Sequence, residues 1–313
     1  MGKYIEIKIA LAAPALLWPA LADAQSIPDI QESITRGSQI DDIIKDQQDR
    51  NDERLRQDET IDGEAGVYVL RRNEIFFVGG GLSAGYSSNP LRTDDDVGGS
   101  FQTSLAFSTG IQTKLAEKFD LGFSVGASGV EYDKSFGPSS RSLNSALSVG
   151  AHIGGTPFYA SLTGFGGWNF DQDFERGTSF YGASAAVSAG LPLGKKTVFR
   201  PGVGVTRQWS QSSENNSTSA AVSIDVVHAL SPRLTFSAAA NVSRTWFDNF
   251  FEDVTFVARK DWQYRGGLSV SYRLSDKASL GLSSSYEKRS STFFLSAYES
   301  FDLDASLSLR LKF

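Results

Sequence analysis

Two histidines, His152 and His228, limit the acid–base chemistry that this chain can perform. Hydrolysis by a serine nucleophile needs a histidine base within hydrogen-bond reach. Both histidines come just before short turn signals, and His228 continues the alternation of Val222, Ile224 and Val226. No neighbouring pattern of Ser, Asn or Asp favours a triad. We therefore expect structural roles for both, no catalytic residue and no enzymatic activity; a lipid-acting enzyme is a remote alternative.

Two acidic runs carry oxygen ligands of the kind that bind Ca²⁺: Asp94 to Asp96, and Asp171, Asp173 and Glu175. Their spacing fits no calcium loop, so we interpret them as solvated loop charge and expect no metal site and no cofactor. The chain has no cysteine, which excludes disulfides and thiolate metal sites. Nothing in the sequence indicates binding to nucleic acid.

A third group of charged residues alternates with apolar residues along extended segments. Its members are Lys114, Arg200, Asp225, Arg265, Arg273, Glu287 and Arg310. On strands, such residues share one face, because successive side chains point to opposite sides. If that face lines a lumen, the basic residues favour anionic solutes. The stronger interpretation is that they pair with inward acids, which also include Asp120, Asp302 and Asp304, and hold the lumen together.

The last 13 residues, Phe301 to Phe313, alternate strictly between apolar and polar side chains. Few soluble strands run this long and end on an aromatic residue at the chain terminus. The pattern is typical of the closing strand of an outer-membrane barrel, with Ser308 where a glycine is usual. We expect Leu309, Leu311 and Phe313 to form the signal that the barrel assembly machinery reads.

The same period of two repeats from Phe76 onward. Short turn signals are centred near Glu117, Gly155, Gly194, Pro232 and Asp276, at intervals close to 40 residues. Six longer polar loops alternate with these five turns, at 88–98, 133–140, 171–177, 212–217, 248–261 and 289–300. This arrangement predicts an all-β membrane protein with a 12-stranded antiparallel transmembrane β-barrel, short periplasmic turns and longer outside loops. A soluble sandwich is the weaker alternative.

Three domains follow from the composition along the chain. Residues 1–24 have Lys3 and Lys8, a short apolar run and a small-residue cleavage site, which indicates a secretory signal peptide. Residues 25–66, with 12 acidic and 5 basic residues, are expected to form a charged, partly helical segment in the periplasm or the lumen; a solvated linker fits equally well. Residues 67–313 form the expected barrel. They contain no run of roughly 20 apolar residues, which excludes membrane-spanning helices.

The stretch from Phe77 to Arg92 reads FVGGGLSAGYSSNPLR, a glycine-rich strand followed by a Tyr-x-x-Asn turn. It resembles the opening of β-barrel porins of proteobacteria, some of which occur with polysaccharide export systems. The resemblance implies an outer-membrane channel for small polar solutes or polysaccharide. The alternative is a non-conducting, autotransporter-like translocation barrel that its N-terminal helix plugs. Expected partners are outer-membrane lipid and lipopolysaccharide, the assembly machinery, and a periplasmic partner of the acidic segment.

Overall fold

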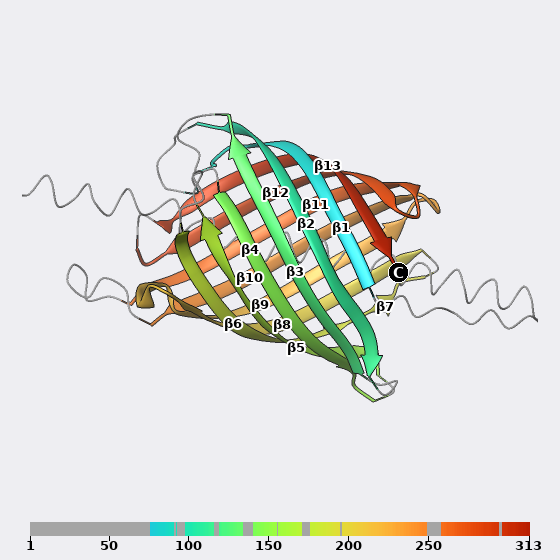
Figure 1. Ribbon diagram of the computed structural model, residues 1–313, viewed down its shortest axis with the longest axis horizontal. Helices are drawn as coiled ribbons and strands as arrows, with labels where there is room; N and C mark the ends of the chain where they lie inside the picture. The colour runs from blue at the N-terminus through green and yellow to red at the C-terminus, as the bar shows by residue number, and fades with distance from the viewer. Residues whose placement is uncertain are drawn as a thin grey trace, which may run out of the picture. The chain divides into compact units, whose positions relative to one another are not determined.

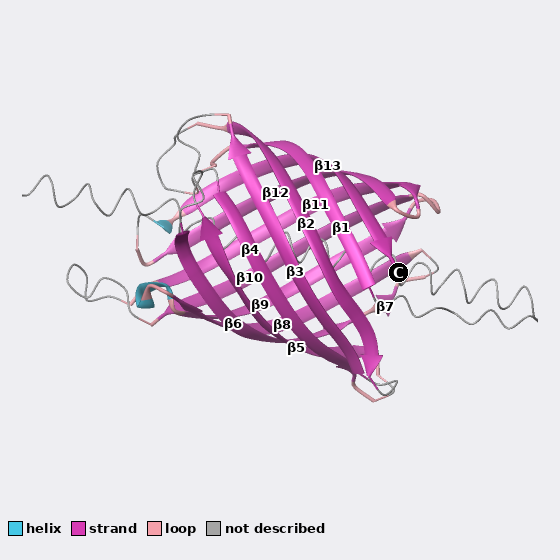
Figure 2. Cartoon of the chain, viewed as in Figure 1, coloured by secondary structure: helices cyan, strands magenta, loops and turns pink. Residues whose placement is uncertain are grey.

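The structure of the chain, a computed structural model, describes residues 76–90, 92, 98–115, 119–133, 140–154, 156–170, 176–194, 196–248, 258–293 and 296–313. Almost all of these residues lie in strands (Figures 1 and 2). The strands are β1 (Phe76–Ser87), β2 (Ser100–Leu115), β3 (Phe119–Tyr132), β4 (Ser140–His152), β5 (Phe158–Phe170), β6 (Arg176–Ala189), β7 (Leu191–Pro192), β8 (Thr197–Ser210), β9 (Ser217–Ala229), β10 (Leu234–Phe247), β11 (Lys260–Ser275), β12 (Ala278–Ser291) and β13 (Tyr298–Lys312), with one 3-10 turn, η1 (Ser213–Asn215).

Neighbouring strands pair antiparallel, and the sheet closes on itself. β1 pairs with both β2 and β13, and β6 pairs with both β5 and β8. At the seam between the first and last strands, the amide of Phe76 donates to the carbonyl of Phe313 at 3.2 Å, and the amide of Phe313 donates to the carbonyl of Phe76 at 2.8 Å. Closure leaves no sheet edge, which is the condition for a sheet to cross lipid.

The barrel is apolar on the outside and polar on the inside. The register places Leu82, Leu105, Val203, Val222 and Leu268 on one face, and all five side chains are exposed. Buried polar side chains occupy the opposite face, on β1, β2, β4, β5, β12 and β13: Ser87, Ser100, Asn144, Asn169, Glu287 and Asp302. A water-soluble protein has the reverse arrangement. The outer face is therefore a lipid-facing surface.

Aromatic side chains on the inner face lie against glycines of the neighbouring strand. Phe165 is opposite Gly182 and Phe180 is opposite Gly167 across the β5–β6 pair. A Cβ added to Gly182 would lie 2.5 Å from the Phe165 ring, and one added to Gly167 would lie 3.0 Å from the Phe180 ring. Gly110 makes the same room for Phe77. Because the glycines accommodate these rings, the rings lie along the wall instead of projecting across the barrel.

The sequence analysis predicts 12 strands, and the described residues form 12 long strands with loops and turns at the expected places. The additional strand β7 continues β6 in the same register, since Ser188 is opposite Gly202 and Leu191 is opposite Phe199. Between these two pairs the hydrogen-bond ladder along β8 is interrupted. Pro201 on β8 lies at the interruption and has no amide hydrogen to donate. The end of β6 is thus a separate two-residue strand, and the turn expected near Gly194 follows it.

No helix in the described ranges is long and apolar enough to cross a membrane. The predicted signal peptide (1–24) and the predicted charged segment (25–66) lie outside the described residues. The predicted barrel domain begins at Val67, and the structure describes it from Phe76.

We predict that Gly182→Ala lowers the free energy of unfolding of the barrel by about 1 to 3 kcal/mol. The new methyl group would meet the Arg207 carbonyl and the Phe165 ring, both at 2.5 Å. Urea unfolding of the folded barrel in lipid vesicles measures the effect. Gly164→Ala in β5 is the matched control, because nothing lies within 4 Å of its added Cβ. Equal effects of the two substitutions would contradict the close contact at Gly182.

Candidate functional site

The inner wall consists largely of small hydroxyl side chains. Serine hydroxyls of adjacent strands hydrogen-bond to each other at 2.6 Å (Ser83 and Ser104), 2.7 Å (Ser128 and Ser142), 2.6 Å (Ser237 and Ser269) and 2.7 Å (Ser279 and Ser308). Several inward serines of β11 to β13 are also exposed, namely Ser271, Ser283, Ser306 and Ser308. Exposure on the inner face means that solvent-accessible space lies inside the wall at these positions.

The seven charged residues expected to line a lumen all fall on the inner side of the register. Arg200 is opposite Asp225, Arg265 is opposite Glu287, Lys114 is opposite Asp120, Arg273 is opposite Ser279, and Arg310 is opposite Gly79. Arg265 and Glu287 form an ion pair near the long-loop end of the barrel. The guanidinium carbon of Arg310 lies 5.2 Å from the Phe77 ring centroid.

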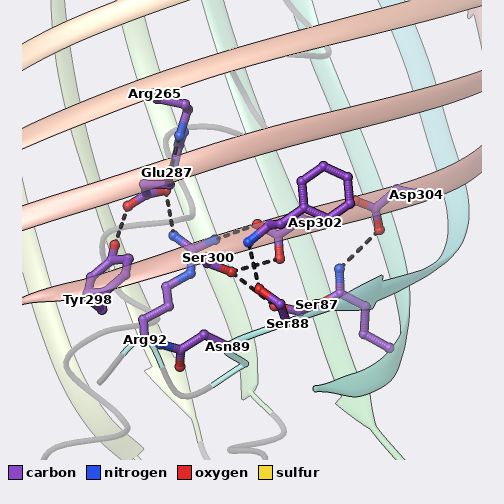
Figure 3. Close-up of polar contacts among 12 residues, drawn as sticks. Ser87, Ser88, Asn89, Arg92, Arg265, Glu287, Tyr298, Ser300, Asp302 and Asp304 are labelled. Atoms are coloured by element: carbon purple, nitrogen blue, oxygen red, sulfur yellow. Dashed lines mark hydrogen bonds and ion pairs between the residues drawn. The ribbon is translucent and has the colours of Figure 1, made fainter. Parts of the chain in front are cut away.

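Glu287 is the centre of a polar cluster near the long-loop end (Figure 3). Its side chain is 1% exposed. One carboxylate oxygen accepts from Gln263 at 2.5 Å and from the Tyr298 hydroxyl. The other accepts from Arg92 at 2.9 Å, from Arg265 Nε at 3.1 Å and from the second Arg265 nitrogen. We call these five residues the Glu287 cluster; it joins β11, β12 and β13 to the loop after β1.

Arg92, which follows β1 in the sequence, contacts the inner wall through its side chain. Its backbone has a left-handed φ of 50°, which is uncommon for a residue with a side chain and costs roughly 1 to 2 kcal/mol. Its guanidinium contacts Glu287 and lies 3.9 Å from Asp302. Burial lowers the pKa of Arg92, but the charges of Glu287, Tyr298 and Asp302 more than offset this and hold the pKa well above its ordinary value. Arg92 therefore remains a cation, and the contacts of its side chain offset the strain of its own backbone.

A second charged cluster lies beside the first. Arg259 donates from Nε to both carboxylate oxygens of Asp261 at 3.0 Å, and Ser291 donates to the same carboxylate at 2.6 Å. The guanidinium also lies 4.2 Å from the Phe247 ring centroid. Arg259 and Asp261 are 7% and 3% exposed, so both clusters replace water with internal hydrogen bonds where the wall meets the loops.

The alternation along β11 and β12 identifies Arg265 and Glu287, but it does not identify Arg92, Gln263 or Tyr298 as their partners. Arg92 lies in a loop, where no periodicity sets the direction of a side chain. It is 195 positions from Glu287 in the sequence, and only closure of the barrel brings them together. The Asn-Pro-Leu-Arg sequence at the start of the loop is the only local signal.

Neither histidine is part of these clusters. His228 lies on the lipid-facing side of β9, and its Nδ1 is 2.8 Å from the Thr197 hydroxyl. His152 packs edge-on against Tyr159 with ring centroids 5.2 Å apart. Both lie at short-turn ends, as the sequence predicts. Within the described ranges, no three His, Cys, Asp or Glu residues gather to form a metal site; both acidic runs that the sequence analysis considers for Ca²⁺ lie outside those ranges.

No family model and no curated protein matches this sequence. Solved structures do match. An outer membrane channel from Pseudomonas putida F1 aligns with a TM-score of 0.54 at 9% identity, over 80% of this chain and 100% of that chain. The beta domain of the Bordetella autotransporter Brka aligns with a TM-score of 0.46 at 13% identity, over 76% and 100% of the two chains. At 9% identity, the first match establishes the fold alone. The TM-score of the second match is below 0.5, and we infer nothing from it.

The closed barrel, its lipid-facing outer surface and the similar solved fold together define the class of this protein. It is a bacterial outer-membrane β-barrel protein, and it resides in the outer membrane. The sequence-based prediction of fold class and location is confirmed. The fold alone does not assign an activity.

We predict that Glu287→Ala lowers the free energy of unfolding by about 3 to 5 kcal/mol, because it leaves Arg92 and Arg265 next to each other without their shared carboxylate. Urea unfolding in lipid vesicles measures the loss. Glu299→Ala is the matched control: Glu299 pairs with Lys288 on the outer face, where both side chains are about half exposed, and its removal should cost less than about 1 kcal/mol. A Glu287 variant as stable as the Glu299 variant would contradict the central role of the cluster.

Proposed function

We propose that this protein is an outer-membrane channel through which small polar solutes, or an extended polysaccharide, cross the membrane. The observation that carries the proposal is the exposure of Ser271, Ser283, Ser306 and Ser308 on the inner wall. Small hydroxyl side chains leave space, and they exchange hydrogen bonds with water or sugar hydroxyls equally well. A barrel of 12 strands lies between the side-chain-filled barrels of about 8 strands and the open porins of about 16.

The aromatic residues of the inner wall support the same proposal. Phe77, Phe165 and Phe180 would narrow the passage if they projected inward. Each instead lies over a glycine of the adjacent strand. The rings therefore contribute packing to the wall without occupying the centre.

The inward charges Lys114, Arg200, Asp225, Arg265, Arg273, Glu287 and Arg310 are proposed to tune which solutes pass. Around Glu287, cations and carboxylates are intermixed, which supports a passage with weak overall charge preference at the long-loop end. This end faces outward in barrels with short periplasmic turns. The solute would then meet the Glu287 cluster first.

We propose a transport role without catalysis. A hydrolytic barrel needs its histidine base at the outer rim, beside a nucleophile. His152 and His228 lie at the opposite, short-turn end, and His228 faces lipid. These placements support the proposal that neither residue acts on a substrate.

We also propose interactions of the chain end and of the acidic segment with other components of the envelope. Leu309, Leu311 and Phe313 lie exposed at the end of the chain, on the outer face. This position leaves them accessible to the assembly machinery as a recognition signal. The acidic segment 25–66 is proposed to contact a periplasmic partner or to plug the lumen, as in an autotransporter-like translocation barrel.

Conductance across a planar lipid bilayer tests the function. The purified full chain should give discrete current steps in KCl. A chain lacking residues 25–66 distinguishes the two modes: unchanged conductance supports an open channel, and a silent full chain with a conducting deletion supports the plug. Two silent proteins that are both folded, as judged by their heat-dependent shift in gel mobility, would contradict the channel.

We further predict that Arg92→Ala raises conductance and shifts selectivity toward cations. The substitution removes a guanidinium from the inner wall of the mouth and leaves Glu287 with one arginine. One charge at about 8 Å in water changes the energy of a passing ion by about 0.5 kcal/mol, or roughly twofold in permeability. The reversal potential in a KCl gradient measures this. Arg141→Ala is the control, because Arg141 pairs with Glu131 on the outer face. An identical reversal potential for wild type and Arg92→Ala would contradict the placement of Arg92 in the ion path.

A further inference from the structure

Arg244 occupies an unusual place on the lipid-facing surface. Its neighbours in the register are Ala220 on β9 and Trp262 on β11, and Trp262 is 40% exposed on the outside of the barrel. The Arg244 guanidinium carbon lies 5.2 Å from the Trp246 ring centroid and 5.1 Å from the Trp262 ring centroid. Two indoles thus hold a cation on the outer wall near the long-loop end.

Arg244 has no carboxylate partner among the residues that the structure describes. Its buried Nε makes no hydrogen bond in that part of the chain. Cation–π contacts of this kind attract the guanidinium to the rings, but they satisfy none of its five N–H donors. A charge left in this state at a membrane surface is costly unless an anion from outside the protein binds it.

The neighbouring arginine differs in this respect. Arg207 on β8 donates to both carboxylate oxygens of Asp248, one of them at 2.8 Å. The hydrogen bond from Arg207 lowers the pKa of Asp248 below its ordinary value, so the pair stays ionised. The chain therefore provides an acid for Arg207 and none, within the described ranges, for Arg244.

A second cation extends the site. One row of the outer face runs from Arg207 through Thr218 and Trp246 to Lys260, on four adjacent strands. Arg244 and Trp262 occupy the next row. With strands about 4.8 Å apart, Lys260 and Arg244 lie within reach of a single phosphate group. Lys260 is exposed and makes no ion pair within the described ranges.

We propose that Arg244, Lys260, Trp246 and Trp262 form a binding site for a phosphate group of the glycolipid in the outer leaflet, that is, of lipopolysaccharide. Arginine binds phosphate through paired N–H donors, and lysine adds a point charge. The two indoles fix the guanidinium and provide flat apolar surfaces at the level where headgroup and acyl chains meet. The long-loop end faces the outer leaflet, which selects the glycolipid over the phospholipids of the inner leaflet. The site is independent of what passes through the barrel.

Native mass spectrometry of the detergent-purified full chain tests the proposal. The ligands are a bis-phosphorylated lipid A, the same lipid without its phosphates, phosphatidylglycerol and inorganic phosphate. Wild type should bind phosphorylated lipid A at least tenfold more tightly than the other three. Arg244→Ala should lose about tenfold in affinity for it, and Arg244→Lys should recover only part of this, because lysine lacks the planar donor pair.

Arg141→Ala is the matched control, since Arg141 is an outward arginine near the same end that pairs with Glu131 at 3.1 Å. Its lipid A affinity should equal that of wild type. Heat-dependent gel mobility confirms that each variant is folded. Equal binding of the dephosphorylated lipid or of phosphatidylglycerol, or equal losses for Arg141→Ala and Arg244→Ala, would overturn the proposal.

Discussion

The structure depends on one constraint: backbone amides and carbonyls inside a bilayer must find partners within the protein. Pairing of β1 with β13 meets this constraint, since it joins the two ends of the sheet. Closure also separates two surfaces: an outer one that faces lipid and an inner one that faces water. The outer face then carries most of the exposed Leu, Val and aromatic side chains, and the inner face carries the paired serines and the Glu287 cluster. The Glu287 cluster also depends on closure, because Arg92 lies in the loop after β1 and reaches Glu287 on β12 only across the seam.

The inner wall combines small residues with charges that compensate one another. Serines pair across strands around much of the circumference, and glycines receive the aromatic rings. Near the long-loop end, the carboxylates of Asp302, Asp261 and Glu287 each have an arginine partner. A water-filled passage with a hydroxyl-lined wall and a rigid, neutralised mouth is consistent with selection by size and hydrogen bonding more than by net charge. The strained backbone at Arg92 is stabilised by the same cluster.

Strand number, loop positions and inward or outward direction could all be predicted from the sequence, because each follows from a period of two and from local turn residues. Arg265 and Glu287 were placed on the inner face for the same reason. Their partner Arg92 could not be predicted, since a loop side chain has no periodicity and its contact joins positions far apart in the chain. The split of β6 at Pro201 is a further example: the effect of a missing amide depends on which residue faces it across the pair. The lipid-facing Arg244 between Trp246 and Trp262 likewise requires the register of β10 and β11.

The central claim is that water fills the barrel and that lipid surrounds it. Because the chain has no cysteine, a single introduced thiol reports on one position without background. Ser283→Cys on the inner face and Leu282→Cys on the outer face, both in the middle of β12, form the most direct comparison. In lipid vesicles, a charged, membrane-impermeant thiol reagent should label position 283 quickly and leave position 282 unlabelled. Labelling of position 282 with protection of position 283 would contradict the account.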